Sequence, residues 1–257
     1  MLLTADIGNT NIVLALFDGE RLVDSWRLHS DRRSTPDELA LSVRAVLSAA
    51  GQDPAGLDGV AVCSTVPALL RTTRAMLARW FEDVDALVVE PGTDVGVRLD
   101  VENPPEVGTD RVMNTLAAGT LFGGPCVVVD LGTSTNFDVV GRDGAYLGGA
   151  IAPGIEVSLD ALTARAAQLS RVALQAPPSV IGRSTAACLQ SGVVYGAAGQ
   201  VDGIVGRILH ELGTPVTAVV ATGGLAPLVV SASRTVTHHR ADLTLVGLRL
   251  AFERTRA

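Results

Sequence analysis

Two short stretches decide the fold, Asp6-Ile7-Gly8-Asn9-Thr10-Asn11 near the start of the chain and Asp130-Leu131-Gly132-Thr133-Ser134-Thr135 in its second half. In each, an Asp ends an apolar run, and an apolar residue, a Gly and small hydroxyl or amide residues follow. An Asp-Gly pair typical of a hairpin turn comes soon afterwards, at Asp18-Gly19 and at Asp143-Gly144. Internal similarity at matching positions predicts a duplicated domain.

The residues around these stretches predict that each half opens with three strands followed by a helix. In the first half, alternating or apolar runs predict strands at 2–7, 11–17, 21–28, 59–64 and 87–89, and helices opening at Thr35 and spanning 66–81. In the second half, we expect strands at 126–132, 135–140, 145–151 and 216–221, and helices at 155–169, 185–212 and 243–254. We therefore expect two α/β domains, residues 1–115 and 116–257.

Composition limits the possible functions. The chain has 257 residues, of which 47% are hydrophobic and 18% charged, enough for the cores of two domains of ordinary size. A net charge of −7 without a basic run disfavours nucleic acid as the main partner. No apolar run is long enough to span a membrane, and the first residues do not resemble a signal peptide, so we expect a cytoplasmic protein. The three cysteines, Cys63, Cys126 and Cys188, are far apart and suggest neither a disulfide framework nor a zinc site.

The sequence contains no lysine, because all 20 basic residues are arginine. A P-loop needs a lysine to reach the phosphates, and a protein-kinase site needs one as well. Enzymes that form a Schiff base through a lysine amine are excluded for the same reason. Any phosphate chemistry must therefore use backbone amides, hydroxyl groups, arginine and metal ions.

The first stretch offers parts for phosphate binding. Gly8 lets the backbone approach a ligand, and the following amides, with the side chains of Asn9, Thr10 and Asn11, offer donors to phosphate oxygens. Asp6 would be repelled by phosphate, so we expect it to act through Mg²⁺ or its waters. The alternative is a hairpin turn that these residues stabilise for its own sake. The stretch at 130–135 offers the same parts from the other half.

Between the two stretches, Gly108-Thr109-Asp110-Arg111 sets an acid beside a guanidinium group. Asp110 could accept the proton of a hydroxyl group during phosphoryl transfer, and Arg111 could hold a substrate carboxylate in bidentate fashion. The alternative is a helix N-terminus, with Asp110 near the positive end of the helix dipole and Arg111 in a surface ion pair.

Taken together, these motifs resemble type III pantothenate kinases. The resemblance runs along nearly the whole chain through D-I-G-N-T-N at residues 6–11, N-P-x-E-V-G-x-D-R at 103–111, D-L-G-T at 130–133, and the runs at 148–154, 182–185 and 222–224. It implies the fold of the actin, sugar-kinase and Hsp70 ATPase superfamily. That fold consists of two duplicated ribonuclease H-like domains, with mixed five-stranded sheets flanked by helices.

The resemblance also implies the activity: phosphorylation of pantothenate by ATP to 4′-phosphopantothenate, the first step of coenzyme A biosynthesis, by a homodimer. Asp110 would be the proton acceptor, and pantothenate would be bound by Gly108, Thr109, Asp110, Arg111 and Thr185. ATP would be bound by Asp6, Ile7, Gly8, Asn9, Thr10, Asn11, Ile12, Val13, Thr133, Gly223 and Gly224. Asp130 would bind a monovalent cation, K⁺ or NH₄⁺, and Asp6 would reach Mg²⁺ through water.

Two positions depart from the family pattern. Val101 stands where the family commonly has Tyr near pantothenate, and Asn136 ends a motif whose usual form is D-x-G-T-A-T-T. Two other functions are open. One is a different small-molecule kinase of the superfamily, such as a sugar kinase, although the short chain disfavours it. The other is a catalytically inactive binding or transcriptional accessory protein.

Overall fold

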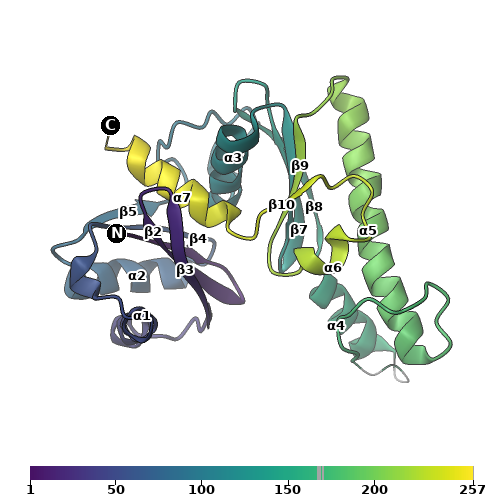
Figure 1. Cartoon of the computed structure of the whole chain (residues 1–257), viewed down its shortest axis with the longest axis horizontal. Coiled ribbons are helices and arrows are strands. Elements are labelled where there is room, and N and C mark those ends of the chain that lie inside the picture. Colours follow the sequence, from purple (N-terminus) through teal and green to yellow (C-terminus); the bar gives the residue numbers. More distant parts are fainter. Residues whose placement is uncertain (167–168, 170, 257) are drawn as a thin grey trace. The chain divides into compact units, whose positions relative to one another are not determined.

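The computed structural model describes residues 1–166, 169 and 171–256 (Figure 1). Contacts within the chain divide it into two compact units, one formed by residues 1–97, 102–117 and 242–257 and the other by residues 98–101 and 118–241. The closing helix α7 (Leu243–Arg254) thus belongs to the first unit by its contacts. The division of the sequence at residues 115 and 116 stays a proposal about the duplicated halves.

The first unit is built on a mixed sheet of five strands. The strands are β1 (Leu2–Ile7), β2 (Asn11–Asp18), β3 (Arg21–His29), β4 (Gly59–Ser64) and β5 (Asp85–Val89). Their order is β3-β2-β1-β4-β5. The β1–β2 and β2–β3 pairs are antiparallel, whereas β4 runs parallel to both β1 and β5.

Helices cover both faces of this sheet. Helices α1 (Pro36–Ala49) and α2 (Pro67–Trp80) pack in one core with Leu3, Ala5 and Ile7 of β1. Helix α7 contacts β1, β2 and β4. Side chains alternate along a strand, so Asp6 points away from the α1–α2 core. Two short 3₁₀ turns, η1 (Pro54–Gly56) and η2 (Pro104–Glu106), complete the unit together with the start of α3 (Thr109–Phe122).

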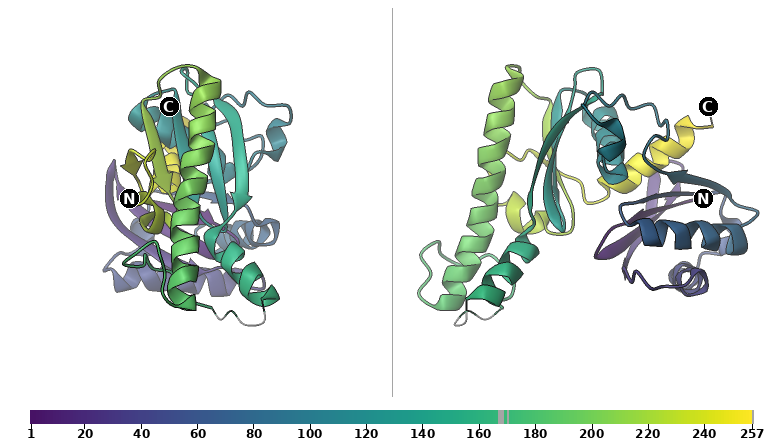
Figure 2. Two further views of the ribbon diagram at one scale, coloured as in Figure 1. Left: turned by 90° about the vertical axis from the view of Figure 1, so that its right-hand side faces the viewer. Right: turned by 180° about the vertical axis from the view of Figure 1, so that it is seen from behind.

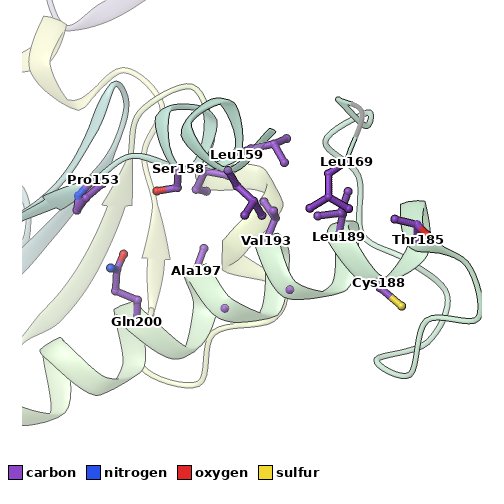
Figure 3. A pocket seen from close by; sticks show the side chains of 14 residues that line it. Pro153, Ser158, Leu159, Leu169, Thr185, Cys188, Leu189, Val193, Ala197 and Gln200 are labelled. Carbon is purple, nitrogen blue, oxygen red and sulfur yellow. The ribbon is translucent and has the colours of Figure 1, made fainter. Parts of the chain in front are cut away.

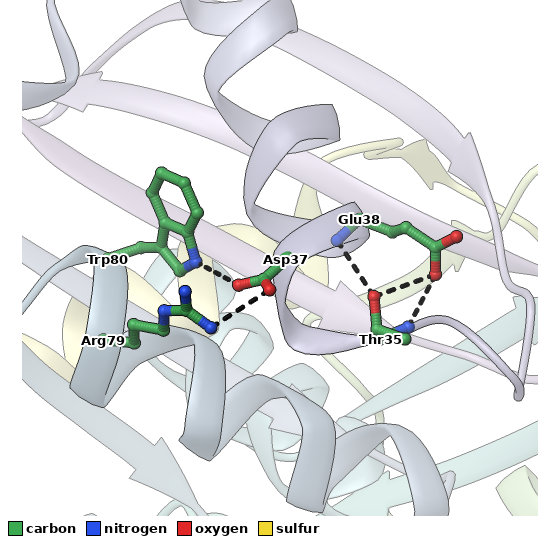
Figure 4. Close-up of polar contacts among 5 residues, drawn as sticks. All are labelled: Thr35, Asp37, Glu38, Arg79 and Trp80. Atoms are coloured by element: carbon green, nitrogen blue, oxygen red, sulfur yellow. Dashed lines mark hydrogen bonds and ion pairs between the residues drawn. The ribbon is translucent and has the colours of Figure 1, made fainter.

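Polar contacts fix the start of α1 against α2 (Figure 4). Thr35 and Glu38 form a reciprocal capping box, which confirms the helix start predicted at Thr35. The carboxylate of Asp37 accepts hydrogen bonds from Trp80 Nε1 at 2.7 Å and from Arg79 Nη1 at 3.0 Å. These bonds tie the first turn of α1 to the last turn of α2.

The second unit repeats the topology of the first. Its strands are β6 (Cys126–Leu131), β7 (Ser134–Val140), β8 (Tyr146–Pro153), β9 (Ala218–Thr222) and β10 (His238–His239), in the order β10-β9-β6-β7-β8. As in the first sheet, the first three strands are antiparallel, and β6 is parallel to the fourth, β9. The predicted fold class, two duplicated α/β domains with mixed five-stranded sheets, is confirmed.

The helices of the second unit are α4 (Ile155–Arg165), α5 (Thr185–Leu212) and α6 (Ala226–Val230). Helix α5 runs along the second sheet (Figure 2), and Val201 and Val205 join its core. The helix expected at 155–169 ends at Arg165, and residues 167–168 of that expectation lie outside the described part of the chain. Across the described residues, no helix combines the length and apolar character that crossing a bilayer requires.

Candidate active site

The turn between β1 and β2 is held by backbone and side-chain bonds within the first unit. Gly8 N donates to Asn11 O at 3.0 Å. The hydroxyl of Ser30 donates to Gly8 O at 2.7 Å, and Ser30 N donates to Thr10 O at 3.0 Å. The turn is therefore a fixed loop whose shape comes partly from the residues after β3.

The structure separates the predicted ATP residues 6–13 into two groups. Ile7 and Ile12 are buried in the core, so their side chains are directed away from any ligand at the turn. Asn9 and Thr10 are exposed at the tip of the turn, and Asn11 is half-buried at the start of β2. Val13 pairs with Asp6 across the two strands and shares its face.

A buried thiol lies beside Asp6. Cys63 on β4 pairs with Asp6 in register, and its Sγ donates to Asp6 Oδ1 at 3.5 Å. Burial, followed by the charges of Asp6 and Asp110, raises the pKa of the Cys63 thiol well above its usual range. The thiol therefore stays protonated and acts as a donor. Asp6 and Cys63 share one face of the first sheet, and the charge of Asp110 also acts on the same thiol.

The predicted G-x-D-R run forms the start of α3, as the alternative interpretation had it. Arg111 N donates both to Gly108 O at 3.0 Å and to Asp110 Oδ1 at 2.9 Å. A Cβ atom on Gly108 would lie 2.5 Å from Asp110 Oδ1, so a side chain there would displace the carboxylate from this position. The Thr109 hydroxyl donates to Ser64 O at 3.5 Å and anchors the run to the end of β4.

Asp110 is half-buried at this helix start. Burial raises the pKa of Asp110, and the backbone N–H and the positive charge of Arg111 oppose this rise in part. A carboxylate with a raised pKa is a better proton acceptor than an ordinary surface Asp. The helix start and a functional role are therefore compatible.

In the second unit, two glycines enclose the turn of residues 130–133. A Cβ atom on Gly154 would lie 2.2 Å from Thr133 O. Gly223 has φ +88°, and a Cβ atom there would lie 2.5 Å from Asp130 Oδ1. Bulkier residues at either position would push the turn away, so this part of the predicted site depends on close backbone approach.

The other predicted residues of the second unit are more exposed. Thr133 and Gly224 are exposed at their turns. Thr185 is the first residue of α5 and lines a groove of about 440 Å³ between α4 and α5 (Figure 3). Most of the other side chains on the groove are apolar, including Leu159, Leu189 and Val193.

The two departures from the family pattern have defined positions in the second unit. Val101 is half-buried, and its Cγ1 would be 3.8 Å from a Cβ atom on Gly148. Asn136 is buried and pairs with Asp130 across β6 and β7, so both side chains share one face of the sheet. The hydroxyl of Ser134 donates to Asn136 Oδ1 at 3.0 Å.

Two contributors, Ser30 and Cys63, were not predicted from the sequence. Ser30 and Cys63 reach the first turn only through the β3 and β4 positions in the sheet, which no local pattern reveals. Gly154 was part of a glycine-rich run whose role the sequence left open. Only knowledge of the strand pairing could have pointed to Ser30 and Cys63.

No group of three or more His, Cys, Asp or Glu side chains suited to a metal ion occurs among the described residues. Mg²⁺ at phosphate-transfer sites is commonly held by one or two carboxylates together with the phosphates of the substrate. Asp6, half-buried at the end of β1 beside the exposed turn, is a donor of that kind. The residues present fit a metal that arrives with its nucleotide.

Comparisons of sequence agree with the motif analysis. Residues 2–207 match the sequence model of a family described as type III pantothenate kinase. A type III pantothenate kinase of Salinispora arenicola is 57% identical over 254 residues, which cover 99% of each chain. Another, of Parafrankia sp., is 58% identical over 254 residues, covering 99% of this chain and 98% of that protein.

Solved structures share the architecture at low identity. One from Campylobacter jejuni, described as a Baf family transcriptional activator, has a TM-score of 0.59 at 18% identity and covers 99% of this chain and 98% of its own. The activator of 2-hydroxyisocaproyl-CoA dehydratase from Clostridium difficile, bound to ADPNP, has a TM-score of 0.56 at 12% identity, with coverage of 99% and 96%. These likenesses show the fold alone, which is that of the actin-like ATPases and sugar kinases.

Proposed function

The chain belongs to the type III pantothenate kinase family and is a kinase that phosphorylates pantothenate for coenzyme A biosynthesis, and from this premise we propose how its residues divide the work. The observation that carries the proposal is the start of α3. There, Gly108 leaves room for the Asp110 carboxylate, and burial raises its pKa.

Asp110 accepts the proton of the pantothenate hydroxyl group as that oxygen attacks the γ-phosphorus of ATP, and the bond from this phosphorus to the β–γ bridging oxygen breaks, with ADP as the leaving group. Its bond from Arg111 N fixes one carboxylate oxygen and leaves the other for the substrate. The Arg111 guanidinium binds the pantothenate carboxylate, and Gly108, Thr109 and Thr185 complete the pantothenate site. Catalysis then rests mainly on positioning and on charge stabilisation.

The β1–β2 turn binds the phosphates of ATP through its backbone amides and through Asn9, Thr10 and Asn11, while Thr133, Gly223 and Gly224 bind ATP from the second unit. Mg²⁺, when bound, offsets the negative charge of the phosphates. Asp6 holds that ion through water, with its carboxylate oriented by the Cys63 thiol. The close approach of Gly154 and Gly223 to residues 130–133 supports a tight turn suited to a ligand.

Asp130 binds a monovalent cation, K⁺ or NH₄⁺. The support is the chemistry of its surroundings, because the Asn136 amide oxygen shares its face of the sheet and Gly223 allows close approach. The three free cysteines and the need for ATP support a cytoplasmic location.

The chain also works as a homodimer, joined through α5. Five glycines, Gly192, Gly196, Gly199, Gly203 and Gly206, follow each other at intervals of four and three residues. This spacing places them on one stripe of the helix, as in helix pairs that pack with a 3.5-residue repeat. A Cβ atom on Gly192, Gly196, Gly199 or Gly206 would meet no atom within 4 Å, so within one chain these positions face open space.

The surface around α4 and α5 supports the same partner. The large hydrophobic residues Ile151, Val157, Leu162, Val180 and Ile181 are between 45% and 80% exposed, and all belong to the second unit. Leu162 also lines the apolar groove of about 440 Å³, and exposed apolar surface of this kind is typical of protein–protein contacts. A second copy of the chain would bury it.

Substitution of Asp110 tests the catalytic proposal. Asp110→Asn keeps an acceptor for Arg111 N but cannot take up a proton, so we expect kcat to fall by about 10²- to 10⁴-fold. The measurement is ADP release with pantothenate, with and without K⁺. Asp83→Asn, at an exposed position, is the control and should keep wild-type kcat.

Four outcomes would count against parts of this proposal. Full kcat in Asp110→Asn would show that another group accepts the proton. Equal activity without a monovalent cation would contradict the role of Asp130. Turnover of sugars but not of pantothenate in a panel of alcohols would favour another small-molecule kinase. If calorimetry detected binding of neither ATP nor pantothenate, a non-catalytic protein would be favoured.

A further inference from the structure

The segment after β3 lies directly against the β1–β2 turn. Ser30 is buried and bonds to the turn at Gly8 O and Thr10 O. Two residues later, Arg32 Nη2 donates to Asn9 Oδ1 at 2.6 Å. All of these residues belong to the first unit, so the contact does not depend on how the two units are placed.

Arg32 carries a positive charge that no acid compensates. Within the described residues, no carboxylate lies within ion-pair distance of its guanidinium group, and its side chain is exposed. Two acids close to Arg32 in the sequence bond to backbone N–H groups, since Asp31 Oδ1 accepts from Arg33 N at 2.9 Å and Glu38 Oε2 accepts from Thr35 N at 2.8 Å. A guanidinium group has five N–H donors, and the bond to Asn9 uses one of them.

The positive charge of Arg32 complements the negative charge of the ATP phosphates. The chain has no lysine, and the turn at residues 8–11 contains no cationic side chain of its own. A triphosphate bound there would place several negative charges next to Asp6. A guanidinium group matches two phosphate oxygens at once and is less strongly hydrated than an ammonium group.

We propose that Arg32 is a phosphate-binding residue of the nucleotide site, held at the β1–β2 turn by Asn9 so that its free N–H groups meet the polyphosphate. This inference rests on the proposed binding of ATP phosphates at the turn. It predicts that the contribution of Arg32 grows with the number of phosphates on the nucleotide and does not involve the adenosine.

Nucleotide titration tests the assignment. For Arg32→Gln, we expect Mg²⁺-ATP to bind about ten- to a hundredfold more weakly, because a hydrogen bond to a charged group is lost. The affinity for ADP should be affected less. Adenosine affinity and the KM for pantothenate should stay unchanged, while the KM for ATP rises. Arg32→Lys should recover part of the ATP affinity. The matched control is Arg33→Gln, because Arg33 is the exposed neighbour and contacts Asp31 through its backbone.

The outcomes separate this inference from the function on which it rests. If the wild-type protein does not bind ATP, nucleotide binding at the turn is wrong and Arg32 loses its role with it. If the wild-type protein binds ATP and Arg32→Gln binds it equally well, only the role of Arg32 is wrong. An equal loss of affinity for ATP and adenosine would show that Arg32 merely shapes the turn through Asn9, and would also overturn the inference.

Discussion

At the scale of single residues, the proposed role of Asp110 as proton acceptor conflicts with stability. Burial raises its pKa in the folded protein above that of the unfolded chain. A carboxyl group of this kind contributes full stability below the unfolded pKa and loses it as the pH rises through the folded pKa. At pH 7 the folded protein therefore holds a charge that it would be more stable without.

Asp110→Asn should accordingly raise the melting temperature at pH 7, by about 2–4 °C for each kcal/mol gained. Because the destabilising charge disappears on protonation, the difference between the variant and the wild type should shrink as the pH falls towards 4. Calorimetric or CD melting of both proteins from pH 4 to 8 measures this. A variant that is less stable at pH 7, or a difference that does not change with pH, would contradict the prediction.

Residues at the turns were predictable from the sequence, whereas their neighbours were not. Gly8, Asp110 and Asp130 belong to short motifs that can be recognised in the sequence itself. The thiol of Cys63 reaches Asp6 only because β4 pairs with β1 in parallel register. Arg32 reaches Asn9 only because β3 returns along β2, a pairing that no local pattern around Arg32 reveals.

At the scale of elements, one carboxylate joins α5 to the loop between α6 and β10. Asp202 accepts from Ser233 Oγ at 2.6 Å, from Thr235 Oγ1 at 2.8 Å and from Arg234 N at 2.9 Å. Burial alone would raise the pKa of Asp202, but these hydrogen bonds outweigh it and lower the pKa. The contribution to stability is therefore present above the unfolded pKa and lost as the pH falls through the folded pKa.

Asp202→Ala should lower the free energy of unfolding by roughly 2 kcal/mol at pH 7, because it leaves several donors of residues 233–235 without their acceptor. Urea denaturation measures the loss, and faster amide exchange at Arg234 and Thr235 would locate it. The loss should diminish in acid. Glu211→Ala, an exposed acid on the same helix, is the control. Equal stability of Asp202→Ala and the wild type would show that water replaces the carboxylate.

Element boundaries followed the sequence where hydrophobic periodicity and end signals agreed. The helix predicted at 185–212 is α5, which begins after the Ser184 cap and ends at Gly213 with φ +60°. By contrast, the start of α3 was predicted only as an alternative, because the residues proposed for the site occupy its first turn and obscure the helix start. The two-residue strand β10 has too little sequence for any periodicity.

At the scale of the whole molecule, the duplication could be predicted from the sequence because the same turn motif follows the first strand of each half. The two sheets have matching strand orders, and the equivalent turns follow β1 and β6. Outside these turns the halves have diverged, and α5 has no counterpart of similar length in the first unit. This extra helix is where a new role for the second unit is most expected, and its glycine stripe points to self-association.

Gly199→Arg tests that role. If two copies of α5 pack through the stripe, an arginine at its centre separates them by bulk and by charge repulsion across the two-fold axis. Light scattering should then give twice the 26.5 kDa chain mass for the wild type and 26.5 kDa for the variant. The variant should remain folded, since a Cβ at this position meets nothing within its own chain and glycine is a poor helix former. Ala45→Arg on the exposed side of α1 should stay dimeric. A monomeric wild type would contradict the homodimer itself, whereas a dimeric Gly199→Arg would move the interface away from α5.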